Sequence, residues 1–291
     1  MKKKSIINTI TMFALPGLIL STAPYPGFSN DTGDKVVIGK TVKLKSRILN
    51  EERRLFIYLP DGYSESKDRY PVLYICTTGE DQFRDTSGIT RALSEQSIIP
   101  KIMVVGLTDI DGGRDLTPTK TDSYGPTSGG ADNFLKYIKN EVIPFVDKNY
   151  RTQPCRIIWG HSIVGTLCIY AFLSTPDTFN IFIVSSPWLI YDEEEMFLLK
   201  NTESFLKKRS SENNFLFLTV GNEPRLLPGI KAFIKILENK KPVGVEWEFT
   251  TMQNENHRSI ISKGLTEGLR AVYSNWKNIP GSCGKSSVKM P

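Results

Sequence analysis

Short apolar runs alternate with longer stretches of helical periodicity from residue 71 onward. The apolar runs are 71–76, 102–107, 156–159, 179–184, 215–220 and 245–250. Near-continuous apolar runs are typical of strands that are covered on both faces, as in a parallel sheet. Helical spacing of apolar residues occupies the segments between them, at 89–97, 131–149, 163–174, 193–209, 227–239 and 260–276. This alternation predicts a three-layer α/β domain with a mostly parallel sheet and right-handed crossovers.

Two further strands are predicted before this region, and they follow a different pattern. Apolar and charged residues roughly alternate over 36–49 and 53–59, with a junction at 50–52. Alternation predicts strands covered on one face only, and the short junction joins them as an antiparallel pair at the edge of the sheet. No internal repeat or long linker interrupts the chain. We therefore predict one domain over 30–276 and a loosely held polar tail over 277–291.

The first residues have the layout of a secretory signal. Three lysines at 2–4 precede an apolar stretch at 6–23, which is the order of the charged and hydrophobic regions of a signal peptide. A membrane-spanning helix is the alternative, but the stretch contains polar residues and a proline and falls short of about 20 mostly apolar residues. Cleavage is expected after Ala23 or near 28–30. We predict a signal peptide over 1–29 and an exported, periplasmic or extracellular protein, with no stable membrane insertion after cleavage.

Composition excludes several classes of protein. Of the 291 residues, 40% are hydrophobic, 10% aromatic and 23% charged, which are ordinary values for a globular protein and exclude a disordered or fibrous chain. The formal net charge is +6, and without the three lysines at 2–4 it is +3, from 34 basic and 31 acidic residues. Such a small excess does not favour nucleic acid as a partner.

Histidine and cysteine limit the chemistry further. The only histidines are His161 and His257, which excludes a metal site built from several histidines, and we expect no metal and no cofactor. The cysteines include no C-x-x-C pair or zinc-like spacing, and three of them lie among apolar residues. We therefore expect buried reduced thiols rather than a disulfide framework. The four cysteines are Cys76, Cys155, Cys168 and Cys283.

The candidate nucleophile is Ser162, in the segment Gly160-His161-Ser162-Ile163-Val164-Gly165. The segment directly follows a predicted strand and directly precedes a predicted helix, which is the context of a nucleophile elbow. Such a turn lifts the serine Oγ to the N-terminus of a helix, where partial positive charge favours a developing oxyanion. Val164 stands where the motif usually has glycine, and Gly165 can supply part of the clearance. We expect His161 to support the elbow rather than to act as a base.

Two later loops supply partners for this serine. Glu223 and His257 each follow a predicted strand, in that order along the chain. Hydrolases with a nucleophile elbow have the acid and then the histidine after the serine, and ligands bind at the carboxyl ends of strands in open α/β sheets. His257 would take the proton of Ser162, and Glu223 would hold the imidazole. Asp192, Glu255 or no acid at all stay open as alternatives to Glu223.

An oxyanion hole needs two N–H donors. The expected donors are the amide of Ile163 and an amide of the loop after 71–76, at Thr78 or Gly79. The long connection 108–128 is expected to form a wall or lid of the substrate pocket. The candidates for lining that pocket are Phe83, Trp188 and Tyr191.

Taken together, these residues resemble the α/β-hydrolase esterases grouped with ferric-enterobactin esterases and esterase D. The likeness runs from about Ser46 to Trp276. It rests on residue groups at 51–54, 58–60, 70–74, 114–119, 129–132, 150–152, 160–162, 186–187 and 255–259. The resemblance implies a three-layer α/β-hydrolase fold, a mostly parallel sheet with antiparallel N-terminal strands, and a serine esterase activity. It also implies Ser162 as nucleophile, His257 as base and Glu223 as acid.

Two positions depart from the pattern of that family. Val164-Gly165 stands where the family usually has two adjacent glycines, and Thr78-Gly79 stands where it usually has Asp-Gly. Extra methyl groups at the elbow could impose an overpacking penalty of about 1 to 3 kcal/mol. The second departure concerns what the pocket recognises more than whether the oxyanion hole forms, because main-chain N–H groups survive a side-chain change.

Two functions from different classes stay open at this point. The first is an exported serine esterase that acts on a small-molecule ester through an acyl-enzyme. The second is a catalytically impaired binding protein on a hydrolase scaffold, suggested by Val164 and by the unsettled acid. Thioester or peptide cleavage would use the same residues, and the sequence does not choose among siderophores, plant phenolic esters, acetylated sugars and other esters.

Overall fold

The computed structural model describes residues 37–275 except 78, 190–196 and 210–212, together with Cys283. Several predictions lie outside the described residues. These are the signal peptide over 1–29, most of the tail over 277–291, and the roles considered for Thr78, Tyr191 and Asp192.

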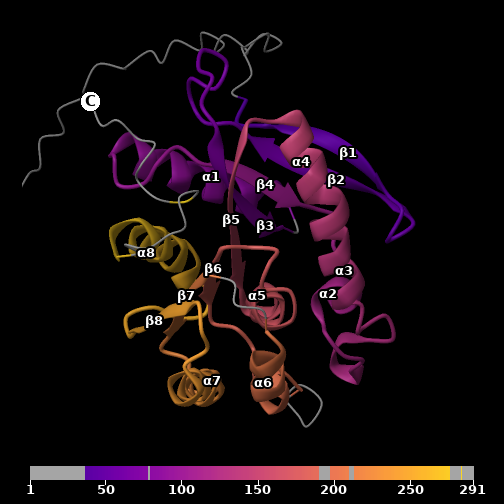
Figure 1. Ribbon diagram of the computed structural model, residues 1–291, viewed down its shortest axis with the longest axis vertical. Coiled ribbons are helices and arrows are strands. Elements are labelled where there is room, and N and C mark those ends of the chain that lie inside the picture. Colours follow the sequence, from indigo (N-terminus) through magenta and orange to yellow (C-terminus); the bar gives the residue numbers. More distant parts are fainter. Residues whose placement is uncertain (1–36, 78, 190–196, 210–212, 276–282, 284–291) are drawn as a thin grey trace, which may run out of the picture. The chain divides into compact units, whose positions relative to one another are not determined.

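One mixed sheet of eight strands, in the order β1-β2-β4-β3-β5-β6-β7-β8, forms the centre of the described domain (Figure 1). The strands are β1 (Lys40–Ser46), β2 (Glu51–Tyr58), β3 (Tyr70–Cys76), β4 (Met103–Leu107), β5 (Thr152–His161), β6 (Ile181–Ser185), β7 (Asn214–Gly221) and β8 (Val245–Met252). β1 pairs with β2, and β2 with β4, in antiparallel fashion, whereas β3 to β8 pair in parallel. The predicted α/β-hydrolase fold with antiparallel N-terminal strands is confirmed.

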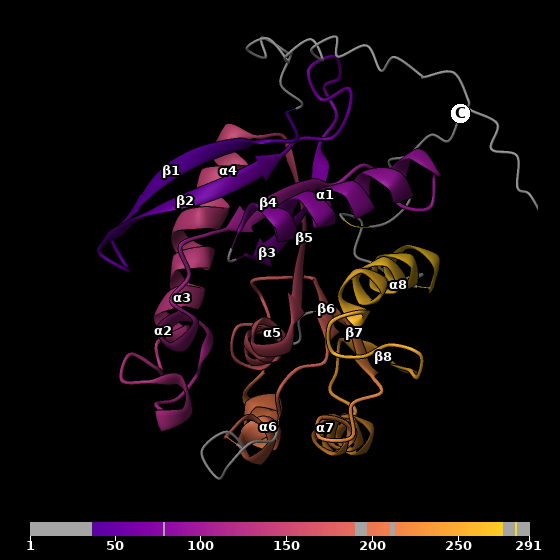
Figure 2. The same cartoon turned by 180° about the vertical axis from the view of Figure 1, so that it is seen from behind.

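Helices cover both faces of the sheet (Figures 1 and 2). α1 and α8 pack on one face, and α3, α4, α5 and α7 on the other. The helices are α1 (Glu80–Glu95), α2 (Gly112–Leu116), α3 (Ala131–Tyr137), α4 (Ile143–Asn149), α5 (Ser162–Ser174), α6 (Phe197–Lys208), α7 (Leu227–Lys240) and α8 (Ile260–Asn275). None of these helices, nor any other in the described part of the chain, is long and apolar enough to cross a membrane.

Side-chain alternation along the strands divides the core into two clusters. On β3, Val72 and Tyr74 pack with the cluster under α3, α4, α5 and α7, whereas Leu73 and Ile75 pack with the cluster under α1 and α8. Successive residues of a strand point to opposite faces. Because both faces of β3 are covered, the strand is apolar throughout, which is why the sequence shows a continuous run there.

Some helix boundaries differ from the sequence prediction. α1 begins at Glu80, well before the predicted start at residue 89. The sequence does not show the early turns because polar residues on the buried face of the helix interrupt the apolar period. These residues are Thr86, Ser87 and Thr90. The predicted helix over 131–149 consists of α3, a π-helical segment (Ile138–Val142) and α4. Pro144, at the start of α4, has no N–H to donate to the preceding turn.

A buried ion-pair network attaches the connection after β4 to β2. Arg53 is 1% exposed, and its Nη2 lies 2.7 Å from Oδ2 of the equally buried Asp115. Arg53 Nε donates to Glu51 at 2.8 Å, and its Nη1 donates to the carbonyl of Thr108 at 3.3 Å. Arg114 Nη2 lies 2.9 Å from the same Glu51 carboxylate. The network therefore fixes the start of the connection 108–128, which contains α2 and the 3₁₀ turn Asp122–Tyr124.

Two glycines bring α8 very close to the sheet. A Cβ at Gly264 would collide with Oγ of Ser185, and one at Gly268 would collide with Cγ2 of Ile183. Both contacted residues belong to β6. α8 therefore lies close against β6, and a larger residue at either position would require the β6 side chain or the helix to shift.

The expectation that the cysteines are buried reduced thiols rather than disulfide-bonded is wrong for one pair. Cys155 on β5 and Cys283 form a disulfide across 128 residues of sequence, whereas Cys76 and Cys168 are free and buried. A pairing over such a separation leaves no local spacing signal, so the absence of a C-x-x-C motif could not exclude it. The disulfide ties Cys283, within the predicted polar tail, to the central strand of the sheet.

Candidate active site

The turn from β5 to α5 places Ser162 at the first position of the helix. β5 ends at His161 and α5 begins at Ser162 without an intervening residue. Ser162 has a φ of +58°, a left-handed conformation that is strained for a residue with a side chain. A Cβ at Gly160 would lie 2.6 Å from Cys168 Sγ, so only glycine fits where the helix returns past the strand. The serine side chain is half-buried.

Val164 fits this turn because the closest approach falls on its neighbour. A Cβ at Gly165 would lie 3.2 Å from the carbonyl oxygen of Ser185 on β6. Val164 itself is half-buried and packs at the margin of the core. The extra methyl groups therefore occupy space beside the elbow rather than the gap between helix and sheet.

Ser162, His257 and Glu223 form a continuous chain of polar contacts. His257 Nε2 lies 3.1 Å from Ser162 Oγ, and His257 Nδ1 lies 2.5 Å from Glu223 Oε1. Glu223 follows β7 and is 9% exposed, whereas His257 follows β8 and is 38% exposed. The two loops meet because β7 and β8 are parallel neighbours whose carboxyl ends lie at the same edge of the sheet. The histidine is thus open to solvent on one side and held by a shielded carboxylate on the other.

Glu255, which the sequence left open as an alternative acid to Glu223, directs its carboxylate to Lys263. Its Oε1 pairs with Lys263 at 3.1 Å, and its main-chain carbonyl accepts a hydrogen bond from Asn222 at 2.7 Å. The Ser259 hydroxyl, and after it Lys263, hold the pKa of Glu255 below its usual value. The side chain is therefore engaged along α8 and not at His257.

Glu223 is held by two donors that sequence patterns did not reveal. The hydroxyl of Ser186 and the amide of Gly221, the latter at 3.1 Å, both donate to Glu223 Oε2. Ser186 is fully buried, has a φ of +46°, and donates its own amide to the carbonyl of Thr219 at 2.8 Å. With Oε2 held by these groups, Oε1 is the oxygen directed at the histidine.

His161, the other histidine, lies beside His257. The two ring centroids are 4.5 Å apart. Burial, and after it the nearby His257, lower the pKa of His161 to about 4. His161 is therefore neutral at neutral pH and adds no positive charge next to His257.

The expected oxyanion donors lie in two places. The amide of Ile163 is in the first turn of α5, where N–H groups have no partner inside the helix. Gly79 is the N-cap of α1, and its amide donates to Thr77 Oγ1 at 3.2 Å. β3, which carries this loop, is the direct neighbour of β5. The loop with Gly79 thus follows the neighbour of the strand that ends at the elbow, and its amide is engaged with Thr77.

The described pocket candidates have different positions. Phe83 is 5% exposed and packs against Phe56 in the core under α1, with ring centroids 5.4 Å apart. Trp188, in contrast, donates from its indole Nε1 to Ser162 Oγ at 2.7 Å. Its ring centroid lies 6.1 Å from that of His257 in a T-shaped arrangement. Of these two aromatic residues, only Trp188 contacts the nucleophile.

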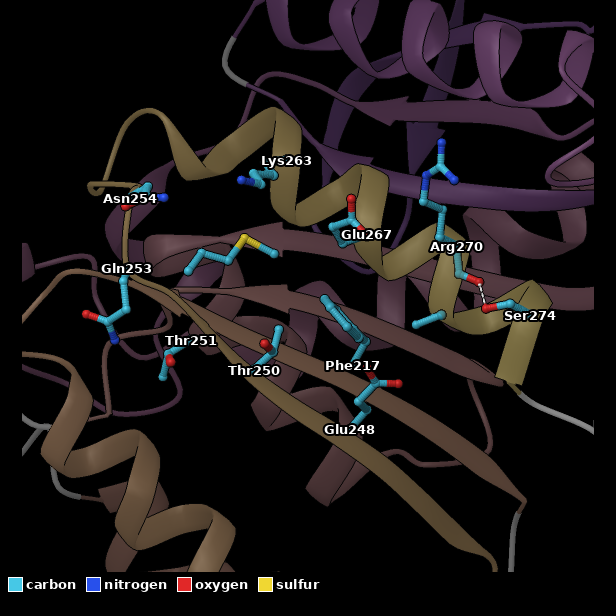
Figure 3. Close-up of a pocket in the computed structure, with 12 residues that line it drawn as sticks. Phe217, Glu248, Thr250, Thr251, Gln253, Asn254, Lys263, Glu267, Arg270 and Ser274 are labelled. Atoms are coloured by element: carbon cyan, nitrogen blue, oxygen red, sulfur yellow. Dashed lines mark hydrogen bonds between the residues drawn. The ribbon is translucent and has the colours of Figure 1, made fainter.

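A separate polar cavity of about 460 Å³ lies between β8 and α8 (Figure 3). Lys263, Glu267 and Arg270 of α8 lie across it from Glu248 and Thr250 of β8, the edge strand of the sheet. The lining residues do not include Ser162, Glu223 or His257. This cavity is therefore distinct from the serine-containing site.

Comparisons with known proteins identify a family and a fold for this chain. A family model described as "Putative esterase" matches residues 46–243. The chain is 26% identical over 253 residues to the ferri-bacillibactin esterase BesA of Bacillus subtilis, an alignment that covers 78% of this chain and 86% of BesA. An IroE-like serine hydrolase of Shewanella oneidensis has a similar structure, with a TM-score of 0.74, 28% identity, and coverage of 80% of this chain and 79% of that one. The siderophore hydrolase EstA of Aspergillus nidulans shares the fold, with a TM-score of 0.71, 19% identity, and coverage of 84% and 97%.

Proposed function

The chain belongs to this esterase family and is a carboxylic ester hydrolase. We propose that it hydrolyses its ester through a Ser162–His257–Glu223 triad and an acyl-enzyme intermediate. The observation that carries the proposal is the chain of contacts from Ser162 Oγ to His257 Nε2 at 3.1 Å and from His257 Nδ1 to Glu223 at 2.5 Å. Nucleophile, base and orienting acid must be within hydrogen-bond reach of one another for this chemistry.

The reaction proceeds in two halves. Ser162 Oγ attacks the ester carbonyl carbon while its proton passes to His257 Nε2, and the carbonyl π electrons move to the oxygen. The bond to the alcohol oxygen then breaks, and His257 returns the proton to that oxygen. A water molecule, deprotonated by His257, attacks the acyl-enzyme and releases the acid. Glu223 accepts the Nδ1 hydrogen throughout and stabilises the imidazolium.

The oxyanion is stabilised from the elbow and from the loop after β3. The amide of Ile163 stands in the first turn of α5, where the helix dipole adds to its effect. The second donor is an amide at the N-terminus of α1, in the segment that contains Gly79. For Gly79 to serve, its hydrogen bond with Thr77 has to exchange for one with the substrate.

The substrate is a small-molecule ester, and siderophore esters are the first class to test. Two proteins similar to this chain are named as a ferri-bacillibactin esterase and a siderophore hydrolase. The alternative of an impaired binding protein has less support, because Val164 fits beside the elbow and a carboxylate lies 2.5 Å from His257.

Export of the protein is also part of this proposal. The order of charged and apolar residues at the start of the chain supports a signal peptide. The Cys155–Cys283 disulfide adds support, because disulfides persist mainly in oxidising compartments outside the cytosol. Mass determination of protein recovered from the culture medium or periplasm tests both points. Recovery of the intact N-terminus in the cytosol alone would contradict export.

A fluorophosphonate probe tests the catalytic assignment directly. We expect covalent labelling of Ser162, identified by peptide mass spectrometry, and turnover of short acyl esters. Ser162→Ala removes both. Ser174→Ala, at the other end of α5, is the matched control and keeps both. If folded wild-type protein is neither labelled at Ser162 nor active on any short ester, the proposed function is wrong.

A further inference from the structure

Trp188 places a hydrogen-bond donor on the oxygen that would carry out the attack. Its indole Nε1 lies 2.7 Å from Ser162 Oγ, closer than His257 Nε2 at 3.1 Å. An indole N–H can donate but cannot accept. The Ser162 hydroxyl proton therefore cannot be directed at Trp188, and the hydroxyl donates instead to His257 Nε2.

The backbone of Trp188 is fixed to the helix that begins with Ser162. The Trp188 amide donates to Thr166 Oγ1 at 2.9 Å, and the Thr166 hydroxyl donates to the Trp188 carbonyl at 2.9 Å. Thr166 lies one turn along α5 and is 7% exposed. Because both main-chain groups of Trp188 are held by one buried side chain of α5, the indole keeps its place relative to the nucleophile.

Trp188 and the proposed oxyanion loop follow strands that lie on opposite sides of β5. β5 is flanked by β3 on one side and β6 on the other. Gly79 follows β3, whereas Trp188 follows β6. The indole donor thus comes from a different loop than Gly79, the proposed second donor to the substrate carbonyl oxygen.

We propose that Trp188 is a further catalytic residue, whose indole N–H stabilises negative charge on Ser162 Oγ when that oxygen attacks and when it leaves. The inference rests on the proposed function. As the Oγ proton passes to His257 Nε2 and the bond from Oγ to the carbonyl carbon forms, the contact with Trp188 becomes a charge-assisted hydrogen bond. When water displaces Oγ from the acyl-enzyme, the bond from Oγ to carbon breaks and the same donor stabilises the departing oxygen.

Acting on Oγ predicts a kinetic pattern of its own. Acylation and deacylation should both slow when the N–H is removed, because Oγ is the nucleophile of one step and the leaving group of the other. A donor that touched only the alcohol of the substrate would affect acylation alone. A side chain that only formed a wall of the pocket would change KM and leave kcat unaltered.

The test removes the N–H and keeps an aromatic ring. Trp188→Phe and the matched control Trp247→Phe, on β8, are compared with wild type in stopped-flow hydrolysis of para-nitrophenyl butyrate and in fluorophosphonate labelling. For Trp188→Phe we expect the rates of acylation, deacylation and labelling to fall about 10- to 100-fold. This decrease is no larger than the one caused by the loss of one oxyanion donor. KM should stay within about threefold of the wild-type value. Trp247→Phe should match wild type in all rates.

The other outcomes overturn the inference. Rates within twofold of wild type, a change in KM alone, or slower acylation with unaltered deacylation each contradict it. If circular dichroism shows that Trp188→Phe does not fold, the same rates are measured with benzothienylalanine at position 188. This isostere keeps the ring shape of tryptophan and lacks the N–H. Failure of wild type itself to label or turn over would instead refute the proposed function, and this inference with it.

Discussion

The hydroxyl of Ser186 donates a hydrogen bond to Oε2 of Glu223, the carboxylate whose other oxygen lies 2.5 Å from His257 Nδ1. Ser186 follows β6 and Glu223 follows β7, so two adjacent strands contribute to the position of one carboxylate. Ser186 adopts a left-handed backbone with a φ of +46°, which directs a fully buried serine at the acid. The acid of the proposed triad is therefore held independently of the histidine.

Two substitutions of Ser186 distinguish the effect of its hydroxyl from the effect of its backbone conformation. Ser186→Ala and Ser186→Gly both remove the hydrogen bond to Glu223, and we expect each to lower kcat about 10-fold because the carboxylate is less well oriented. Glycine accepts a positive φ without penalty, so Ser186→Gly should be more stable than Ser186→Ala by about 1 kcal/mol. Steady-state kinetics and urea unfolding measure the two effects. Equal stability of the two variants would contradict the backbone argument.

Replacing Glu223 with glutamine tests its role as the orienting acid. An amide at this position can donate to His257 Nδ1 and favour the wrong tautomer, so we expect Glu223→Gln to lower kcat about 10³- to 10⁴-fold. Glu255→Gln is the matched control, because Glu255 is nearer to His257 in sequence but pairs with Lys263. Its kcat should remain within about twofold of wild type. A large loss in the control with none in Glu223→Gln would reassign the acid.

His161 should make the fold sensitive to acid. Its folded-state pKa is lowered to about 4 from an ordinary 6.5, so the unfolded chain binds the proton more readily between these values. Stability from this group is present above about pH 6.5 and is lost as the pH falls toward 4. Between neutral pH and about pH 4.5, wild type should lose about 2 kcal/mol more unfolding free energy than His161→Gln, in denaturant titrations. Equal losses in the two proteins would contradict this assignment.

Asp115 should be essential to stability because its partner is a buried guanidinium. Asp115→Asn removes the buried carboxylate that pairs with Arg53, which is itself 1% exposed, and leaves Glu51 as its remaining carboxylate partner. We expect a loss of about 3 to 5 kcal/mol in unfolding free energy. The control is Glu52→Gln, which breaks the exposed pair with Lys43 and should change stability by about 0.5 kcal/mol or less. Similar losses of unfolding free energy in the two variants, measured by urea unfolding, would contradict the prediction that the buried ion pair contributes more to stability than the exposed one.

Thiol counting tests the disulfide. Protein denatured without reductant should take up two alkyl groups, on Cys76 and Cys168, and reduced protein should take up four. The double variant Cys155→Ser with Cys283→Ser should lose about 2 to 4 kcal/mol of unfolding free energy, since the crosslink no longer restricts the unfolded chain. Four adducts without reduction would contradict the pairing.

The strand pattern and the order of serine, glutamate and histidine were readable in the sequence for a common reason. β3, β6 and β7 are covered on both faces and are therefore apolar throughout, which marks their ends clearly. Since the carboxyl ends of parallel strands meet at one edge, Glu223 and His257 were expected near Ser162 once those ends were known. The start of α1 was not readable, because Thr86 and Ser87 are buried there.

Contacts made through main-chain turns left no pattern. Ser186 and Trp188 stand on the turn after β6, where the chain direction depends on the positive φ of Ser186 and on hydrogen bonds with Thr166. Neither the positive φ nor these hydrogen bonds follow from a residue spacing in the sequence. The sequence therefore predicted Trp188 only as an aromatic residue of the pocket. Phe83 shows the reverse case, an aromatic residue near the site in sequence whose surface is buried against Phe56.

Gly264 and Gly268 also determine how this enzyme could adapt to new esters. His257 lies just before α8, and these glycines seat α8 directly on β6. A shift of α8 away from β6 would therefore also displace the turn that carries His257. We therefore expect changes of substrate range to arise more readily through insertions and substitutions in the connection that follows β4.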